Sequence, residues 1–185
     1  MPTQTAKHKP MSGFGPLIAR QYAFALAMLR QAIQHCDDSQ WTTAREPWLA
    51  PARLAIHILT STRHYCRRPG LKLKLPRWAD RMGWDSIPRS DLPSREQVLT
   101  YVDEVERQAC RWLGGLSDAQ LLSPDGGYKW TGRVRADRAL YTLRHIHHHL
   151  GQLNVELRLA GSEPAPWLLE HDLPRQYPED ALPTF

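Results

Sequence analysis

The segment from His145 to His149 reads HIHHH and places four histidines within five positions of an expected helix. It lies inside the chain and apolar residues flank it on both sides, so it does not have the character of a purification tag. Neutral imidazole is the commonest protein ligand of transition metals, so this run predicts a metal site. The apolar residues around it recur at helical spacing and define a buried face independently of the histidines: Leu143, Ile146, Leu150, Leu153 and Leu157.

Two histidines of this run lie on the same flank of the buried face. Successive residues of an α-helix are rotated by about 100°, which aligns His145 and His149 in a row that continues through Gln152 and Glu156. Histidines four residues apart can bind one metal ion, as in HExxH helices. Gln152 and Glu156 are candidates to orient these ligands. Spacing alone leaves two alternatives open. In the first, the histidines bind no metal and only form hydrogen bonds to a neighbouring helix. In the second, Gln152 and Glu156 are ordinary polar residues at the edge of the core.

A third ligand must come from another helix, and the segment LAIHILTSTRHY offers His57 and His64. These two lie about 10 Å apart along a helix axis, so one ion does not readily bind both. His64 lies close to a basic helix end, whereas His57 lies among Leu54, Ile58 and Leu59. We therefore favour His57 as the third ligand. The alternative is that His57 binds no metal and is hydrogen-bonded at the edge of the core.

Four segments have the pattern of long helices. The third begins after Ser94, which forms a capping-box pattern with Gln97. The expected helices cover about 17–35, 49–67, 95–113 and 134–160. This pattern predicts an all-α four-helix bundle over residues 13–161. We expect a long loop between helices two and three, a disordered N-terminus at 1–12 and an extended C-terminal tail at 162–185.

The composition predicts one folded domain in a reducing compartment. A chain of 185 residues with 42% hydrophobic residues can bury a sizeable core. Three separated cysteines without a CxxC pair indicate no disulfide framework. The run from Arg20 to Arg30 resembles a short signal peptide, with Ala25-Leu26-Ala27 as its cleavage site, but cleavage there would remove most of the first helix. No run has the length of a membrane span. We expect a cytoplasmic protein that does not bind membranes.

The net charge of +5 allows anionic partners. Basic residues and two tryptophans gather between Cys66 and Trp84, a combination that can bind single-stranded nucleic acid. No nucleic-acid-binding motif accompanies them, so a solvated basic loop is the favoured interpretation.

The histidines also carry a resemblance to the DinB/YfiT-like superfamily. The last helix of that family has a histidine, two more histidines three and four positions later, and then a Gly-Gln pair. The corresponding residues here are His145, His148, His149, Gly151 and Gln152. On the second helix, His57 stands in the ligand position and Tyr65 in the usual aromatic position. The resemblance spans roughly Phe14 to Gly161.

This resemblance implies a four-helix bundle that holds a divalent metal, usually zinc or nickel, on three histidines. Carried over by residue, the ligands are His57, His145 and His149. Characterised relatives include transferases that use low-molecular-weight thiols, such as bacillithiol, mycothiol or glutathione, and also hydrolases. The chain departs from the family at Leu150, where a basic residue is common, and in its basic loop at 67–93.

Three histidine ligands leave a coordination position open, as in catalytic sites. A metal ion there can ionise a bound water or thiol. We therefore expect a metal-dependent thiol transferase or hydrolase that acts on a small molecule. One alternative is a non-catalytic, metal-binding or stress-associated bundle. A second is a nucleic-acid-binding protein that uses Lys72, Lys74 and Arg77. Relatives often pair, which makes a homodimer a further expectation.

Overall fold

The computed structural model describes residues 13–79 and 83–172, where the regular elements are helices and one isolated antiparallel bridge joins Pro124 and Val134. In these residues the bundle consists of four long helices: α1 (Phe14–His35), α3 (Pro51–Tyr65), α4 (Arg95–Gly114) and α6 (Arg135–Leu159). Shorter helices lie between and after them: α2 (Asp38–Trp41), η1 (Pro47–Leu49), η2 (Arg89–Asp91), α5 (Asp118–Leu121) and η3 (Glu170–Asp172). The prediction of an all-α four-helix bundle is confirmed.

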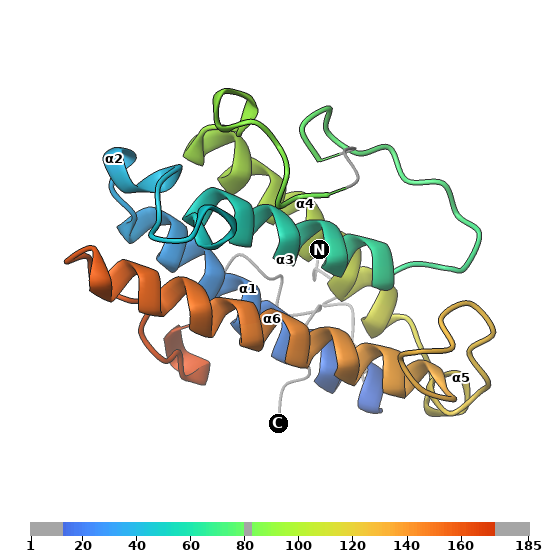
Figure 1. Ribbon diagram of the computed structural model, residues 1–185. Coiled ribbons are helices and arrows are strands. Elements are labelled where there is room, and N and C mark those ends of the chain that lie inside the picture. The colour runs from blue at the N-terminus through green and yellow to red at the C-terminus, as the bar shows by residue number, and fades with distance from the viewer. Residues whose placement is uncertain (1–12, 80–82, 173–185) are drawn as a thin grey trace, which may run out of the picture.

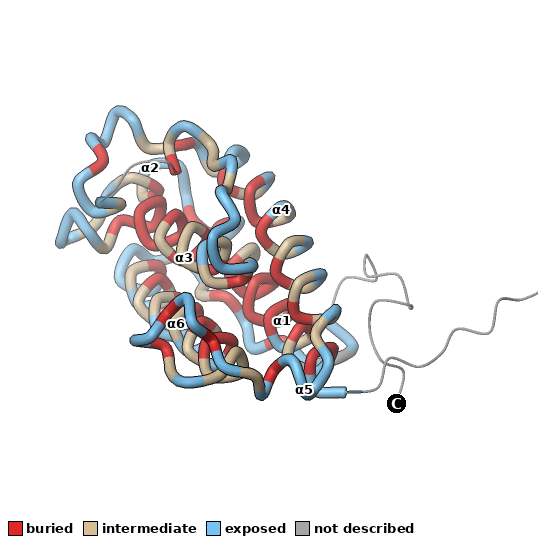
Figure 2. Tube along the Cα trace, turned by 90° about the vertical axis from the view of Figure 1, so that its right-hand side faces the viewer, coloured by how far each residue is buried: buried red, intermediate tan, exposed pale blue. Residues whose placement is uncertain are grey.

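The four long helices surround one core. α1 packs mainly against α4 and α6, and α3 packs mainly against α6 and α4 (Figure 1). Their buried segments face one another in the end-on view of Figure 2. Each helix contributes fully buried apolar side chains, among them Leu26, Leu59, Val105 and Ile146. Removing such side chains from water stabilises the fold by about 1.5–3 kcal/mol each.

Local sequence signals account for where the long helices begin and end. At the start of α4, the Ser94 hydroxyl accepts a hydrogen bond from the Gln97 amide, and the Gln97 side chain accepts one from the Ser94 amide. This is the predicted capping box. Asp137 accepts hydrogen bonds from two backbone amides at the start of α6. Gly161 ends α6 with a φ of +82°, in the left-handed region that favours glycine.

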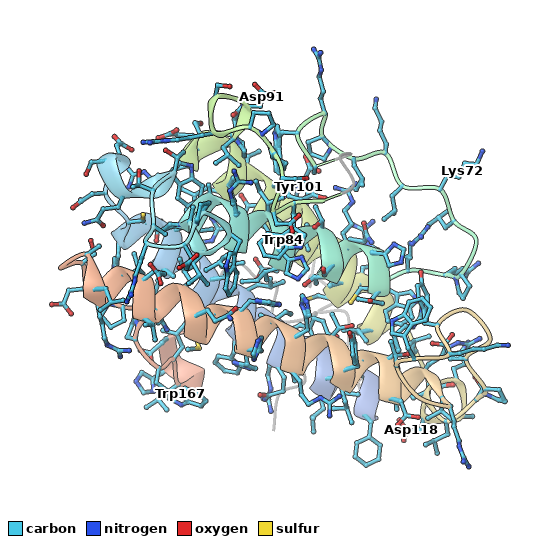
Figure 3. The ribbon with its side chains drawn as sticks, viewed as in Figure 1. Lys72, Trp84, Asp91, Tyr101, Asp118 and Trp167 are labelled. Atoms are coloured by element: carbon cyan, nitrogen blue, oxygen red, sulfur yellow. The ribbon has the colours of Figure 1, made fainter. Side chains whose placement is uncertain are left out.

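The long loop between α3 and α4 returns across α3. Arg53 of α3 donates hydrogen bonds to the carbonyl oxygens of Trp84 and Ile87, at 3.1 and 2.6 Å. Trp78 packs edge-on against the ring of Tyr101 on α4, with centroids 5.1 Å apart. Lys72 lies on the outer arc of this loop (Figure 3), and is exposed. These contacts hold the end of the loop, and Trp84 with it, against the bundle.

The described part of the C-terminal tail, 162–172, follows the bundle surface. The amide of Ala165 donates a hydrogen bond to the side chain of Asn154 on α6, and Ala165 and Leu168 are buried against the core. The expected disordered segment 1–12 and the last part of the tail, 173–185, lie outside the described residues. None of the described helices is both long enough and apolar enough to cross a membrane.

Candidate metal centre

The pairing of α3 with α6 brings together the histidines that the sequence indicated as ligands. His145 and His149 lie one turn apart on α6, with ring centroids 4.5 Å apart. His57 of α3 lies 4.7 Å from the first ring and 4.5 Å from the second. One ring nitrogen from each histidine lies within 4.8 Å of the other two. The Nε2 atoms of His57 and His145 are 3.0 Å apart.

Two aromatic side chains border this group. Trp84, from the end of the long loop, stacks on the ring of His57 with centroids 4.2 Å apart and an interplanar angle of 27°. The rings of Trp84 and His149 are arranged edge to face, with centroids 6.4 Å apart. Tyr141, one turn before His145 on α6, lies nearly parallel to that histidine at 6.4 Å. The histidines are therefore only partly accessible to water.

Burial keeps the imidazoles neutral. Desolvation, followed by the neighbouring histidines, lowers the pKa of His57 to about 3 and that of His145 to about 4. Desolvation also lowers the pKa of His149, although its hydrogen bond to Gln152 acts in the opposite direction. A metal can bind only the unprotonated nitrogen of an imidazole. The site is thus ready to bind a cation at neutral pH without first losing protons.

Gln152 fixes the tautomer of one histidine. Its side-chain oxygen lies 2.7 Å from Nδ1 of His149. Since an amide oxygen only accepts, Nδ1 carries the proton and Nε2 keeps a free electron pair. This is the role expected of a residue that orients a ligand. Glu156, the other candidate, lies one turn further along and lines a surface pocket with Gln152 and Trp48.

The donor set fits a divalent metal ion. It consists of neutral imidazoles, which suit zinc, nickel, copper and iron. Two ligands of one zinc ion, each at about 2.1 Å, lie at most about 4.2 Å apart, so small side-chain rotations are enough to bring the three nitrogens onto one ion. Nδ1 of His145 is buried and has no hydrogen-bond partner among the described residues. The group of possible ligands found in residues 13–79 and 83–172 contains only these histidines, which leaves a coordination position open.

Other histidines of the sequence lie outside this group. His147 and His148 are exposed, although the ring of His148 meets His149 at 4.9 Å. His64 lies near the end of α3, where its ring contacts Tyr128. The histidine run is thus a pair facing α3 and two exposed residues, and the pair is the one that the angular argument aligned on one flank of the buried face.

Sequence reasoning did not find the two aromatic walls. Tyr141 lies four residues before His145, and this i, i+4 spacing was a usable signal. Trp84 had no local signal, because its position depends on how Arg53 holds the returning loop.

The comparison with protein families agrees with this arrangement. The model of the DinB superfamily matches residues 21–153, which include all three histidines of the group. No curated protein and no solved structure matches the chain.

Proposed function

The chain belongs to the DinB superfamily, and on this basis we propose that it binds zinc or nickel through His57, His145 and His149 as a metal-dependent enzyme. The observation that carries this proposal is the group of neutral imidazoles with nitrogens within 4.8 Å of one another, on two helices that the core holds together.

The reaction that this site supports best is thiol transfer to a small molecule, and hydrolysis is the alternative reaction. Bound at this site, the metal would supply Lewis acidity that lowers the pKa of a thiol or water in the open position. Gln152 holds His149 in the tautomer that binds metal. Trp84 and Tyr141 limit the access of water and offer flat surfaces to a substrate. No carboxylate of the described residues belongs to the group, so activation of the nucleophile rests on the Lewis acid.

The experiment that tests the metal site is elemental analysis of untagged protein, purified without chelator, beside two double variants. We expect about one zinc or nickel per chain in the parent and none in His145→Ala/His149→Ala. The matched control is His147→Ala/His148→Ala, which removes the exposed histidines of the same helix and should keep the metal. Circular dichroism checks that each variant is folded. A folded parent that stays metal-free after reloading, or a His145→Ala/His149→Ala variant that keeps its metal, would contradict the proposal.

A second measurement separates catalysis from a purely structural metal. The protein is loaded with cobalt, whose visible spectrum reports its ligands, and a low-molecular-weight thiol is added. A new sulfur-to-cobalt band supports an open position and justifies assays of thiol transfer and hydrolysis. An unchanged spectrum favours the non-catalytic alternative.

A further inference from the structure

The helices α3 and α4 end, and α6 begins, at the end of the bundle on the right of Figure 1. Residues from these helix ends and from the adjoining loops line a basic pocket. It has a volume of about 490 Å³. No acidic side chain of the described residues is among those that line it. Its walls combine arginines with apolar surface: Arg68, Arg111, Arg135 and Arg138, with Trp112 and Leu116.

Much of the positive charge around this pocket is not neutralised. The side chains of Arg68 and Arg111 are exposed and form no ion pair with any described residue. Arg135 donates to the carbonyl oxygen of Gln120 and to the hydroxyl of Ser123, both uncharged groups that fix its direction. These three guanidinium groups therefore present an excess of positive charge to one pocket.

Arg138 completes the pocket from inside the protein. Its side chain is fully buried, and Nε lies 2.8 Å from Oδ2 of the equally buried Asp125. Nη1 donates to the carbonyl oxygen of Arg67 at 3.1 Å. The rings of Trp112 and Tyr128 each lie 4.7 Å from the guanidinium carbon. Nη2 is buried without a hydrogen-bond partner among the described residues. Nε of Arg138 and both carboxylate oxygens of Asp125 are buried in the same way, so Arg138 and Asp125 form an internal ion pair and the excess of positive charge in the pocket comes from the other three arginines.

Helix dipoles do not explain this grouping. Basic residues are favoured near the ends of helices such as α3 and α4, where the backbone carries partial negative charge. Arg135 and Arg138, however, lie in the first turn of α6, where the dipole repels cations. Asp125 accounts for Arg138, whereas Arg135 forms no ion pair with any described residue, and an anionic ligand would supply its counterion.

We propose that this pocket binds the phosphate group of a small phosphate monoester, whose aromatic or apolar part lies against Trp112 and Leu116. Arginine forks match the oxygens of phosphate, and a dianion suits an excess of several positive charges. Arg138 and His145 are seven residues apart, or about 10 Å along α6. The pocket is thus separate from the histidine group, and the failure of either proposal leaves the other untouched.

Isothermal titration calorimetry with phenyl phosphate tests this proposal. The protein is used free of metal, so that phosphate cannot bind to an ion on the histidines. The variant Arg68→Gln/Arg111→Gln removes two exposed charges whose side chains form no ion pair with any described residue. The matched control, Arg45→Gln/Arg158→Gln, removes the same charge from exposed arginines elsewhere on the bundle. We expect binding to the parent and the control, and binding at least about tenfold weaker in the pocket variant, because two charge-assisted hydrogen bonds are lost.

Four outcomes would overturn the proposal. The first is no binding of phenyl phosphate to the parent. The second is an equal loss of affinity in the control, which would show a diffuse charge effect. The third is inorganic phosphate binding as tightly as phenyl phosphate, which would remove the role of the apolar wall. The fourth is a single-stranded oligothymidylate that binds where phenyl phosphate does not, which would assign the pocket to a nucleic-acid backbone.

Discussion

Replacement of Trp84 by alanine should make metal binding more sensitive to acid than it is in the parent. The indole stacks on His57 at 4.2 Å, and desolvation is the main cause that lowers the pKa of this histidine to about 3. Without the ring, water reaches the imidazole and its pKa rises towards the ordinary value of about 6.5. A protonated imidazole cannot bind metal, so the affinity is lost as the pH falls through the pKa of the folded protein.

The size of the effect follows from the competition between protons and metal. An imidazole with a pKa of about 6.5 weakens metal binding roughly 25-fold between pH 7 and pH 5, so three of them weaken it roughly 15,000-fold. With pKa values of about 3 and 4, His57 and His145 together contribute a factor of only about 1.1 over that range. His149 has a lowered pKa and contributes at most about 25-fold. Between pH 7 and pH 5 the zinc affinity of the parent should therefore fall by less than about 25-fold, and that of Trp84→Ala should fall by up to about 25-fold more.

The assay is calorimetric titration of zinc into metal-free protein at pH 7 and pH 5, corrected for the ionisation of the buffer. Trp167→Ala is the matched control, since that indole is 74% exposed and belongs to the C-terminal tail. A parent that loses more than about 1,000-fold would refute the assignment of neutral, desolvated ligands. An identical pH dependence in Trp84→Ala and the parent would refute the role of the indole.

Three further predictions concern single contacts. Asp125→Asn leaves the charge of Arg138 buried without its counterion, so urea denaturation should show a free energy of unfolding lower by about 3–5 kcal/mol; a loss below about 1 kcal/mol would contradict this account. Gln152→Ala removes the acceptor for Nδ1 of His149 and should weaken zinc about 10–100-fold without changing the circular dichroism spectrum; unchanged affinity would count against it. Ser94→Ala removes the hydroxyl that caps α4 and should cost about 1 kcal/mol in thermal denaturation, whereas an unshifted transition would show that the cap contributes nothing.

Much of the bundle could be predicted because its signals are local. The apolar residues Ile146, Leu150, Leu153 and Leu157 of α6 are buried, as their spacing predicted. The same spacing placed His145 and His149 on one flank. Periodicity and capping act within one or two turns, so one sequence is enough to show them. The short helices α2 and α5 were missed, because four residues are too few to show a helical period, even though α5 begins with a capping box of its own.

The parts that were not predicted depend on contacts between distant residues. Arg138 is charged and lies in the first turn of a helix, which predicts an exposed side chain. It is fully buried because Asp125, from the turn before α6, and Trp112, from α4, surround it. Trp84 likewise reaches the histidines because Arg53 donates hydrogen bonds to the carbonyl oxygens of Trp84 and Ile87. No periodicity in the sequence encodes either of these contacts.

Basic residues gather in two places that can bind anions: the loop between α3 and α4, and the arginine pocket at the end of the bundle. The sequence groups Trp84 with the basic loop, but in the structure this tryptophan faces His57 while Lys72 and Lys74 are exposed. Most of the arginines that converge on one pocket come instead from helices, Arg111 from the end of α4 and Arg135 from the start of α6. Arg68 belongs to the first residues of the loop. Exposed loop charges attract a polyanion through its counterions, with an affinity that depends steeply on salt. A pocket with fixed guanidinium groups binds one small anion by hydrogen bonds of defined direction. An anion whose binding is lost in Arg111→Gln but kept in Lys72→Gln is therefore bound by the pocket and not by the loop.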